Sequence, residues 1–344
     1  MSLLNAITGH DRPKNILLGS IGTARVATTY LFTGESGIGK RLAAIEFAGA
    51  VNCLNPVKVI RNPQLATRNP QSATRNPQPE YLDACDSCSS CRKFSSLLHP
   101  DLKVVEADSG LIKIDTIREV QEFLSFTPYE GRKKVVIIDG AECMNPSASN
   151  AFLKTLEEPP PDSVIILITM APDRLLDTIR SRCFVVRFSP LSISACRDVI
   201  SRKVSGLDAE TLESLAAFSM GRPGVAIQGE GAMARDTISG MVHDIVGGGL
   251  SFQWKDRTDM DQWCNLFLMV LRDMIVMKIN PDNRGLLINR WLESEISAIS
   301  RSMELEEILK LYSEVSLLMA HFRFNLNTSI VSNYIKSMFV NRVT

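Results

Sequence analysis

The chain has 344 residues, of which 45% are hydrophobic, and its 38 Lys and Arg residues balance 38 Asp and Glu residues. The length exceeds that of one ordinary hydrophobic core, so two or three domains are expected. The balanced charge excludes binding of nucleic acid through net charge, and any such contact needs a local basic face or a shared assembly.

The sequence predicts neither secretion nor a membrane span. The first residues lack the basic start and apolar run of a signal peptide. The longest apolar stretch, 264–277, is interrupted by Arg272 and Asp273, and it is shorter than the roughly 20 residues of a transmembrane helix. We therefore expect a cytoplasmic protein without membrane contact, whose eight cysteines are mostly reduced.

The first regular pattern, between residues 27 and 54, is a short apolar strand, a glycine-rich turn and a helix. Glycines let backbone N–H groups curl around an anion at the helix N-terminus, and a lysine in the turn adds positive charge. This order predicts a phosphate-binding loop for ATP or ADP. The predicted nucleotide-binding residues are Gly34, Glu35, Ser36, Gly37, Ile38, Gly39, Lys40, Arg41 and, from a later strand, Asp139.

A tandem repeat follows the helix, with RNPQLAT, RNPQSAT and RNPQ occupying residues 61–78. Its Pro, Asn, Gln and Thr residues cannot bury an apolar face, and the copies are too few for a solenoid. We predict a disordered insertion without chemistry of its own.

Four cysteines flank this repeat. Cys85, Cys88 and Cys91 have the spacing of thiolates around one tetrahedral ion, and Cys53 precedes the repeat. The long gap after Cys53 becomes a short connection if the repeat expanded inside an existing zinc loop. Because a shell of four thiolates leaves no open position for water, we predict a structural Zn²⁺ in a module spanning 53–91. The alternative is a set of reduced surface cysteines or a redox pair.

Further short apolar runs alternate with helical segments beyond the cysteines. Such alternation predicts a parallel sheet that is covered on both faces, that is, an α/β fold. The predicted strands of this part are 102–106, 134–139, 164–169 and 184–188.

Strand patterns disappear after Pro190. Helices are predicted at 193–204 and 209–220, followed by a turn at 221–224, and a glycine hinge at 247–249 precedes a helical remainder. We expect an α/β domain over 1–190, a small helical lid domain over 191–246 and an all-helical collar domain over 247–344.

The phosphate loop lacks two groups that hydrolysis needs. Where Ser or Thr normally holds Mg²⁺, the chain has Arg41, whose side chain has donors and no acceptor. Asp139 ends a strand where a Mg²⁺-organising carboxylate belongs, but Gly140 follows where hydrolytic enzymes place a glutamate. Glu142, two residues further on, is expected to point elsewhere. We predict poor hydrolysis at this site, and a slow but working ATPase is the alternative.

The run NAFLKTLEEPP at 150–160, followed by SRC at 181–183, resembles the motifs of the AAA+ clamp-loader family. Three further segments, at 99–102, 114–120 and 130–145, extend the resemblance, which is strong over the first ~190 residues and covers the helical remainder only in outline. It implies a P-loop AAA+ domain with a RecA-like parallel sheet and an inserted zinc module. A helical lid and a helical collar that joins five subunits in a ring are implied as well.

The resemblance also implies a role for Arg182. Clamp loaders open a sliding clamp and place it on primer–template DNA. Their ATP sites lie at subunit interfaces, and the SRC arginine of the neighbouring subunit completes each site. Arg182 matches that arginine, and a guanidinium offsets charge on a transferred γ-phosphate. An ordinary surface ion pair is the alternative. Arg222 is a weaker match to a phosphate-sensing arginine, and Met170 stands beside Thr169 where motor subunits have polar sensing groups.

We therefore predict a clamp-loader subunit for DNA replication that supplies a trans arginine finger, while its own ATPase is weak or absent. It has no polymerase site of its own. Its expected partners are the motor and other loader subunits, the sliding clamp and primer–template DNA. An active motor-type ATPase is one alternative. A zinc-dependent DNA-binding module is another, although aromatic residues do not alternate with basic ones near the cysteines.

Overall fold

The computed structural model describes residues 2–59, 81–108, 110–227, 230–247, 250, 252, 254, 256–282, 284–320 and 327–343. The predicted disordered repeat at 61–78 lies outside these residues. The chain divides into two compact units, the first formed by Met1–Val199 with Met220–Gly224 and the second by Ile200–Ser219 with Val225–Thr344.

The first unit is built on a five-stranded sheet in the order β4-β5-β6-β1-β7, in which every neighbouring pair is parallel. The central strands are fully buried because apolar side chains on both faces meet helices. The strands of this sheet are β1 (Thr29–Thr33), β4 (Leu102–Glu106), β5 (Lys134–Asp139), β6 (Ser163–Thr169) and β7 (Phe184–Arg187).

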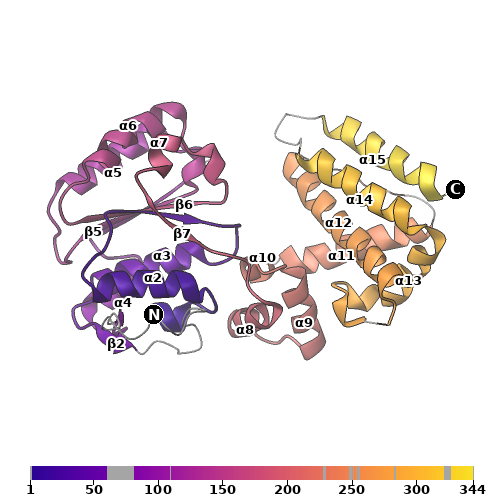
Figure 1. Ribbon diagram of the computed structural model, residues 1–344, viewed down its shortest axis with the longest axis horizontal. Helices are drawn as coiled ribbons and strands as arrows, with labels where there is room; N and C mark the ends of the chain where they lie inside the picture. Colours follow the sequence, from indigo (N-terminus) through magenta and orange to yellow (C-terminus); the bar gives the residue numbers. More distant parts are fainter. Residues whose placement is uncertain are drawn as a thin grey trace, which may run out of the picture. The chain divides into compact units, whose positions relative to one another are not determined.

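Two helical layers cover the sheet, with α2 and α3 on one face and α5, α6 and α7 on the other (Figure 1). Successive residues along β5 contribute to opposite layers: Val135 and Ile137 face the first, and Val136 and Ile138 the second. The helices of this unit are α1 (Leu3–Ala6), α2 (Asp11–Gly22), α3 (Lys40–Val51), α4 (Ser89–Ser95), α5 (Ile114–Ser125), α6 (Pro146–Glu157) and α7 (Asp177–Arg180).

A small antiparallel pair, β2 (Val57–Val59) and β3 (Tyr81–Asp83), lies between α3 and α4 in the chain. Tyr81 packs at the edge of the core formed by α2 and α3. This pair brings the segment that follows Asp83 back to the end of α3, which places the cysteines on both sides of the repeat near one another.

The second unit is helical, and its core is a single cluster that includes Trp263, Phe267, Ile308, Leu311 and Ile335. Its longest helix, α12, packs against α11, α13 and α14. The helices of this part are α9 (Ala209–Phe218), α11 (Glu230–Val246), α12 (Arg257–Ile279), α13 (Glu293–Ser302), α14 (Leu305–Ala320) and α15 (Thr328–Val343). Helix α8 (Ile193–Lys203) contains the boundary between the units.

The predicted parallel α/β sheet and the helical remainder are both confirmed, and the strand limits differ from the predicted ones by a residue at most. The turn predicted at 221–224 is wrong in part, because helix α10 (Pro223–Ile227) begins inside it. Proline suits the first helical position, where its missing N–H costs nothing. The two units do not separate a lid at 191–246 from a collar at 247–344, so that division stays a prediction.

Candidate functional site

The predicted phosphate-binding loop connects β1 to α3. Gly37 and Gly39 have positive φ angles, of 77° and 98°, and a side chain at Gly34 would come within 2.5 Å of the Phe188 carbonyl. Glycine is therefore required at these turns. Gly39 caps α3 without any side-chain hydrogen bond, and a Cβ there would meet no atom within 4 Å. There is therefore open space beside the start of α3, and the N-terminus of a helix is a position that suits an anion such as phosphate.

Lys40 begins α3 and its side chain is held across the loop. Its Nζ donates to the carbonyls of Gly34, at 2.7 Å, and Glu35, at 2.6 Å. Burial lowers the pKa of Lys40, although the nearby carboxylates of Asp139, Glu142 and Glu35 act in the opposite direction. Two backbone carbonyls therefore hold the ammonium within the loop.

The structure places His10, which belongs to none of the motifs described from the sequence, against the phosphate loop. Its Nε2 lies 2.8 Å from the carbonyl of Ile38, and its ring packs edge-on against Phe188. Burial lowers the pKa of this imidazole. His10 also lines a pocket of about 630 Å³, together with residues that include Arg12 and Arg187. A left-handed φ of 52° at His10 follows a glycine, which was the available sequence signal of a turn there.

Arg41 turns toward the ends of strands β4 and β5. Its guanidinium forms an ion pair with Glu106 and lies 4.0 Å from Oδ2 of Asp139. Burial raises the pKa of Asp139, although the charges of Arg41 and Lys40 favour its ionised form. A cationic side chain therefore stands at the position where a phosphate loop normally holds Mg²⁺ through a hydroxyl and a strand-end carboxylate.

Gly140 adopts a left-handed φ of 77° directly after β5. A glutamate at this position would be strained, because side-chain-bearing residues avoid that conformation. Glu142 follows in the short 3₁₀ turn η3 (Ala141–Cys143), and its Oε1 accepts a hydrogen bond from the Met170 N–H at 3.2 Å. Its carboxylate still lies close enough to influence Lys40.

Arg222 and the first turn of α10 contact the phosphate loop. The N–H of Gly224 donates to the carbonyl of Gly37 at 2.9 Å, and Nε of Arg222 lies 3.5 Å from a carboxylate oxygen of Glu35. A Cβ at Gly224 would come within 2.8 Å of Gly37. Arg222 therefore lies against Glu35 of the loop, a contact that the sequence did not reveal.

The four cysteines flanking the repeat lie together. Cys53 follows α3, Cys85 follows β3, Cys88 caps α4 and Cys91 lies in its first turn. Their Sγ atoms all lie within 4.8 Å of one another, close to the ~3.8 Å separation that tetrahedral ligation at 2.3 Å requires. Backbone N–H groups of Cys85, Cys88 and Cys91 point at sulfurs of the group, at 3.3–3.4 Å.

The chemistry of the group fits a thiophilic cation. Burial raises the pKa of Cys53 and of Cys91, and the neighbouring thiols raise that of Cys91 further. A hydrogen bond from Ser87 lowers the pKa of Cys85 to about 6. Thiolates crowded in this way repel one another unless a cation neutralises them. The group can therefore hold one metal ion, and its four protein ligands would close the shell.

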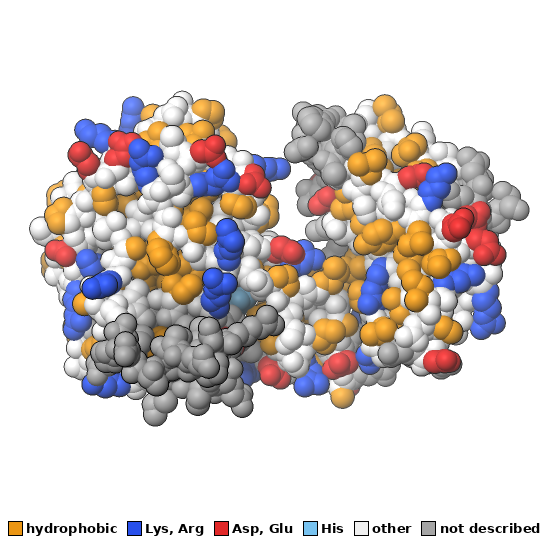
Figure 2. Space-filling model, in the orientation of Figure 1, with side chains coloured by type: hydrophobic (Ala, Val, Ile, Leu, Met, Phe, Trp, Pro, Cys, Tyr) orange, Lys and Arg blue, Asp and Glu red, His pale blue; other side chains and the backbone are white. Residues whose placement is uncertain are grey.

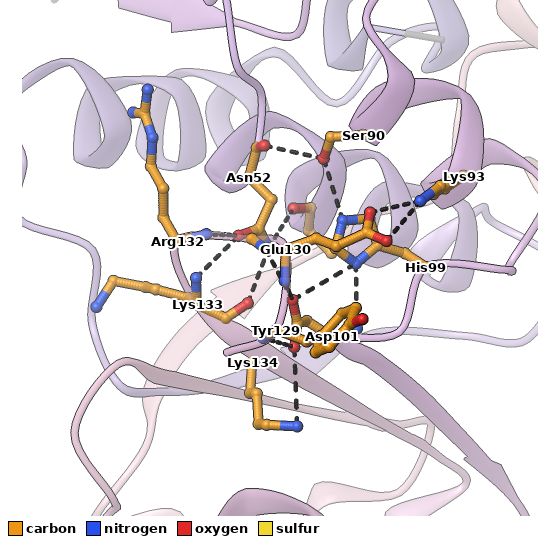
Figure 3. A network of polar contacts seen from close by, with 12 residues as sticks. Asn52, Ser90, Lys93, His99, Asp101, Tyr129, Glu130, Arg132, Lys133 and Lys134 are labelled. Atoms are coloured by element: carbon orange, nitrogen blue, oxygen red, sulfur yellow. Dashed lines mark hydrogen bonds and ion pairs between the residues drawn. The ribbon is translucent and has the colours of Figure 1, made fainter. Parts of the chain in front are cut away.

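A buried carboxylate anchors the loop before β5. Asp101 accepts hydrogen bonds from the N–H groups of Tyr129, Glu130 and Gly131 at 2.7–2.8 Å, and Lys134 lies 3.7 Å away (Figure 3). Burial alone would raise the pKa of Asp101, but these N–H donors and Lys134 outweigh it and hold the pKa below its ordinary value. Asp101 is therefore ionised and fully paired.

The same network reaches the cysteine group through His99, for which the sequence showed no partner. His99 accepts the N–H of Asp101 at Nδ1, and its Nε2 lies 3.3 Å from Oγ of Ser90 (Figure 3). Ser90 in turn donates to the carbonyl of Asn52, whose side chain accepts from the N–H groups at 132–133. Asn52 and Ser90 each precede a cysteine of the group, so the network ties the cysteine module to the sheet.

Arg182 lies at the surface after α7, with 34% of its side chain exposed. Its Nη1 donates to the Thr178 carbonyl at 2.8 Å and its Nη2 to Glu157 at 2.6 Å. Glu157 belongs to the LEEPP run at the end of α6, so the two motifs that resemble the clamp loaders contact each other. The guanidinium is pre-oriented and remains accessible to a ligand.

A parallel sheet with a glycine-rich loop and a lysine between the inner strand β1 and a helix is the arrangement of the P-loop fold class. Residues 64–192 match the family described as DNA polymerase III, delta subunit. The DNA polymerase III subunit delta' of Bacillus subtilis is 31% identical over 284 residues, which are 79% of this chain and 79% of the relative. The chain therefore belongs to the family of DNA polymerase III delta prime subunits.

Two further relatives are also DNA polymerase III subunits. The delta' subunit of Pseudomonas aeruginosa is 34% identical over 227 residues, covering 65% of this chain and 62% of the relative. The DNA polymerase III subunit tau of B. subtilis is 30% identical over 208 residues, covering 60% of this chain and 32% of the relative. The resemblance to the clamp-loader family is confirmed.

The helices and one face of the surface show two further features. Among the described residues, no helix is both long and apolar enough to cross a bilayer. Lys and Arg side chains are interspersed with Asp and Glu over the visible face (Figure 2).

Proposed function

We propose that this chain is a subunit of the DNA polymerase III clamp loader, which places a sliding clamp on primer–template DNA during replication. In this role it assembles with gamma/tau motor and delta subunits and supplies Arg182 to the ATP site of a neighbouring motor. Its own phosphate loop takes ATP or ADP but hydrolyses it weakly or not at all, and the four cysteines hold a structural Zn²⁺.

Two features of the same chain carry the proposal, an exposed and oriented Arg182 and a phosphate loop that lacks two groups needed for hydrolysis. Arg182 is exposed, and hydrogen bonds to Thr178 and Glu157 hold its guanidinium in one orientation. A pre-oriented guanidinium loses little entropy when it binds a γ-phosphate. The loop itself has Arg41 at the metal position and Gly140 at the position of the water-activating glutamate.

Zinc is supported as a structural ion by its surroundings. Cys53 and Cys91 are buried and pack with Ala50 and Ala84. All four thiols are needed for a tetrahedral shell, which leaves no ligand position for substrate. The module would therefore stabilise the connection between α3 and α4 and take no direct part in chemistry.

The test is a reconstituted loader in which only this chain is varied. An arginine finger contributes about 10³-fold or more to the site that it completes, so Arg182→Ala should remove the share of clamp- and DNA-stimulated ATPase that this one site supplies. Arg180→Ala is the matched control, because Arg180 is a neighbouring exposed arginine that pairs with Asp173 and Asp177. Equal ATPase activity of the two variants would refute the proposed role of Arg182 as an arginine finger.

The isolated chain tests its own catalytic capacity. Steady-state ATP hydrolysis by the purified protein should not exceed that of Lys40→Ala, which controls for contaminating ATPases. Turnover that disappears in Lys40→Ala would instead establish a motor-type ATPase, the alternative that the sequence left open.

A further inference from the structure

The position after the P-loop lysine holds a cation of its own. Arg41 is the second residue of α3, and its guanidinium lies between the carboxylates that end two adjacent strands, Glu106 of β4 and Asp139 of β5. In a working P-loop enzyme, Mg²⁺ occupies this place, held by a Ser or Thr hydroxyl and the strand-end aspartate. Here the protein supplies positive charge where the metal would otherwise supply it.

The residues present do not fit Mg²⁺. That ion requires near-octahedral oxygen ligands at 2.0–2.1 Å, whereas a guanidinium has no lone pair to offer. The carboxylate of Asp139 already has Arg41 within 4.0 Å, and the ammonium of Lys40 is close enough to affect its ionisation. A divalent ion would have to displace one cation and approach another.

The same residues do fit phosphate. A Cβ at Gly39 would meet no atom within 4 Å, so there is space beside the start of α3, and Lys40 is turned into the loop. Arginine binds phosphate oxygens with two parallel N–H donors. The Arg41 side chain is 39% exposed, so it can exchange a carboxylate for a phosphate oxygen with little loss of packing.

We propose that this loop binds nucleotide phosphates without a divalent cation, with the Arg41 guanidinium in place of Mg²⁺. The inference rests on the proposed function, in which the loop retains nucleotide without hydrolysing it. It specifies the ligand as the metal-free nucleoside di- or triphosphate. It also gives Arg41 a role in binding, whereas the sequence position of Arg41 indicated only the loss of a Mg²⁺ ligand.

The test is equilibrium binding of ADP and ATP to the full chain by calorimetry, once in EDTA and once in Mg²⁺ in excess over nucleotide. The wild-type chain should bind in EDTA, and Mg²⁺ should leave the affinity unchanged or weaken it by withdrawing free nucleotide. Arg41→Thr should bind at least tenfold more weakly in EDTA and should gain affinity from Mg²⁺, because a hydroxyl then faces Asp139. Arg118→Thr, which removes an exposed arginine of α5 paired with Asp115, should behave as wild type.

Three results would overturn the inference: no binding by the wild-type chain in EDTA, a tenfold or greater gain of wild-type affinity with Mg²⁺, or undiminished binding by Arg41→Thr in EDTA. Binding that survives in Lys40→Ala would also overturn it, since the ligand would then lie elsewhere. Circular dichroism of each variant checks that it is folded. None of these results bears on the Arg182 experiment, so the clamp-loader role and the metal-free site fail separately.

Discussion

Replacing Asp101 with asparagine should strongly destabilise the first unit. Asp101 is fully buried and accepts three backbone N–H groups, one at Oδ1 from Tyr129 and two at Oδ2 from Glu130 and Gly131. Asparagine has nearly the same shape but carries an NH₂ group in place of one oxygen. Whichever way the amide turns, at least one buried N–H donor then faces another donor.

The magnitude follows from those contacts. A hydrogen bond to a charged acceptor contributes about 1.5–3 kcal/mol, and the better amide orientation gives up the Tyr129 bond and the charge opposite Lys134, which is 3.7 Å away. Removing one partner of a buried pair typically costs about 3–5 kcal/mol. We expect Asp101→Asn to lower the free energy of unfolding of this unit by about 3 kcal/mol or more.

Urea unfolding followed by circular dichroism measures the change, with a midpoint shift of more than about 1 M expected from ordinary slopes. All three Trp residues lie in the second unit, so tryptophan fluorescence reports that unit separately. The control is Asp115→Asn, an exposed carboxylate paired with Arg118, which should cost less than about 1 kcal/mol. A loss below 1 kcal/mol for Asp101→Asn would refute the reasoning.

The pH dependence of this difference has a definite sign. The folded-state pKa of Asp101 lies below the ordinary value of 3.8, so its contribution is complete above the unfolded pKa and is lost as pH falls through the folded pKa. The stability gap between wild type and Asp101→Asn should therefore be constant from neutral pH to about pH 4 and shrink below it. A gap that already narrows between pH 7 and pH 5 would contradict this.

The remaining predictions concern the metal and the finger. The purified chain should contain one zinc ion per molecule by elemental analysis. Cys91→Ser should lose the zinc, whereas Cys143→Ser, which lies outside the group of four cysteines, should keep it. Zinc retained by Cys91→Ser would argue against a four-thiolate shell. Deletion of residues 61–78 should preserve both zinc content and assembly with the loader, since the repeat offers no apolar face, and loss of either would show that the repeat matters. Arg182→Lys should recover little of the loader ATPase activity lost in Arg182→Ala, because an ammonium lacks the forked donors of a guanidinium. Full recovery would show that Arg182 acts only through its positive charge.

Much of the first unit was predictable because its signals are local. Continuous apolar runs such as those of β5 and β6 arise from strands buried on both faces, and the glycines of the phosphate loop mark turns that other residues avoid. The position of Arg41 next to Lys40 was readable as a departure from a known pattern. Its partnership with Glu106 was not, because Glu106 lies far away in the chain and reaches Arg41 only through the pairing of β4 with β5.

The cysteine module was likewise predictable only in part. The spacing of Cys85, Cys88 and Cys91 predicts a shared ligand, since a helix start brings such residues within a few ångströms. The inclusion of Cys53 depended on the path of the chain, which β2 and β3 return to the end of α3. His99 had no visible partner in the sequence because those that it contacts, Ser90 and the backbone of Asp101, form a network only after folding.

By itself, the amino-acid sequence determined the local chemistry of this protein: the phosphate loop and its two departures, the thiol spacing, and the SRC motif with Arg182. Tertiary structure alone decided which distant groups meet, as in the ion pair of Arg41 with Glu106, the hydrogen bond from Arg182 to Glu157 and the three N–H donors around Asp101. The physical reason is the distance along the chain over which each interaction acts. Backbone conformation and ligand spacing depend on neighbours in the chain, whereas the burial and pairing of charges depend on which strands and helices pack together.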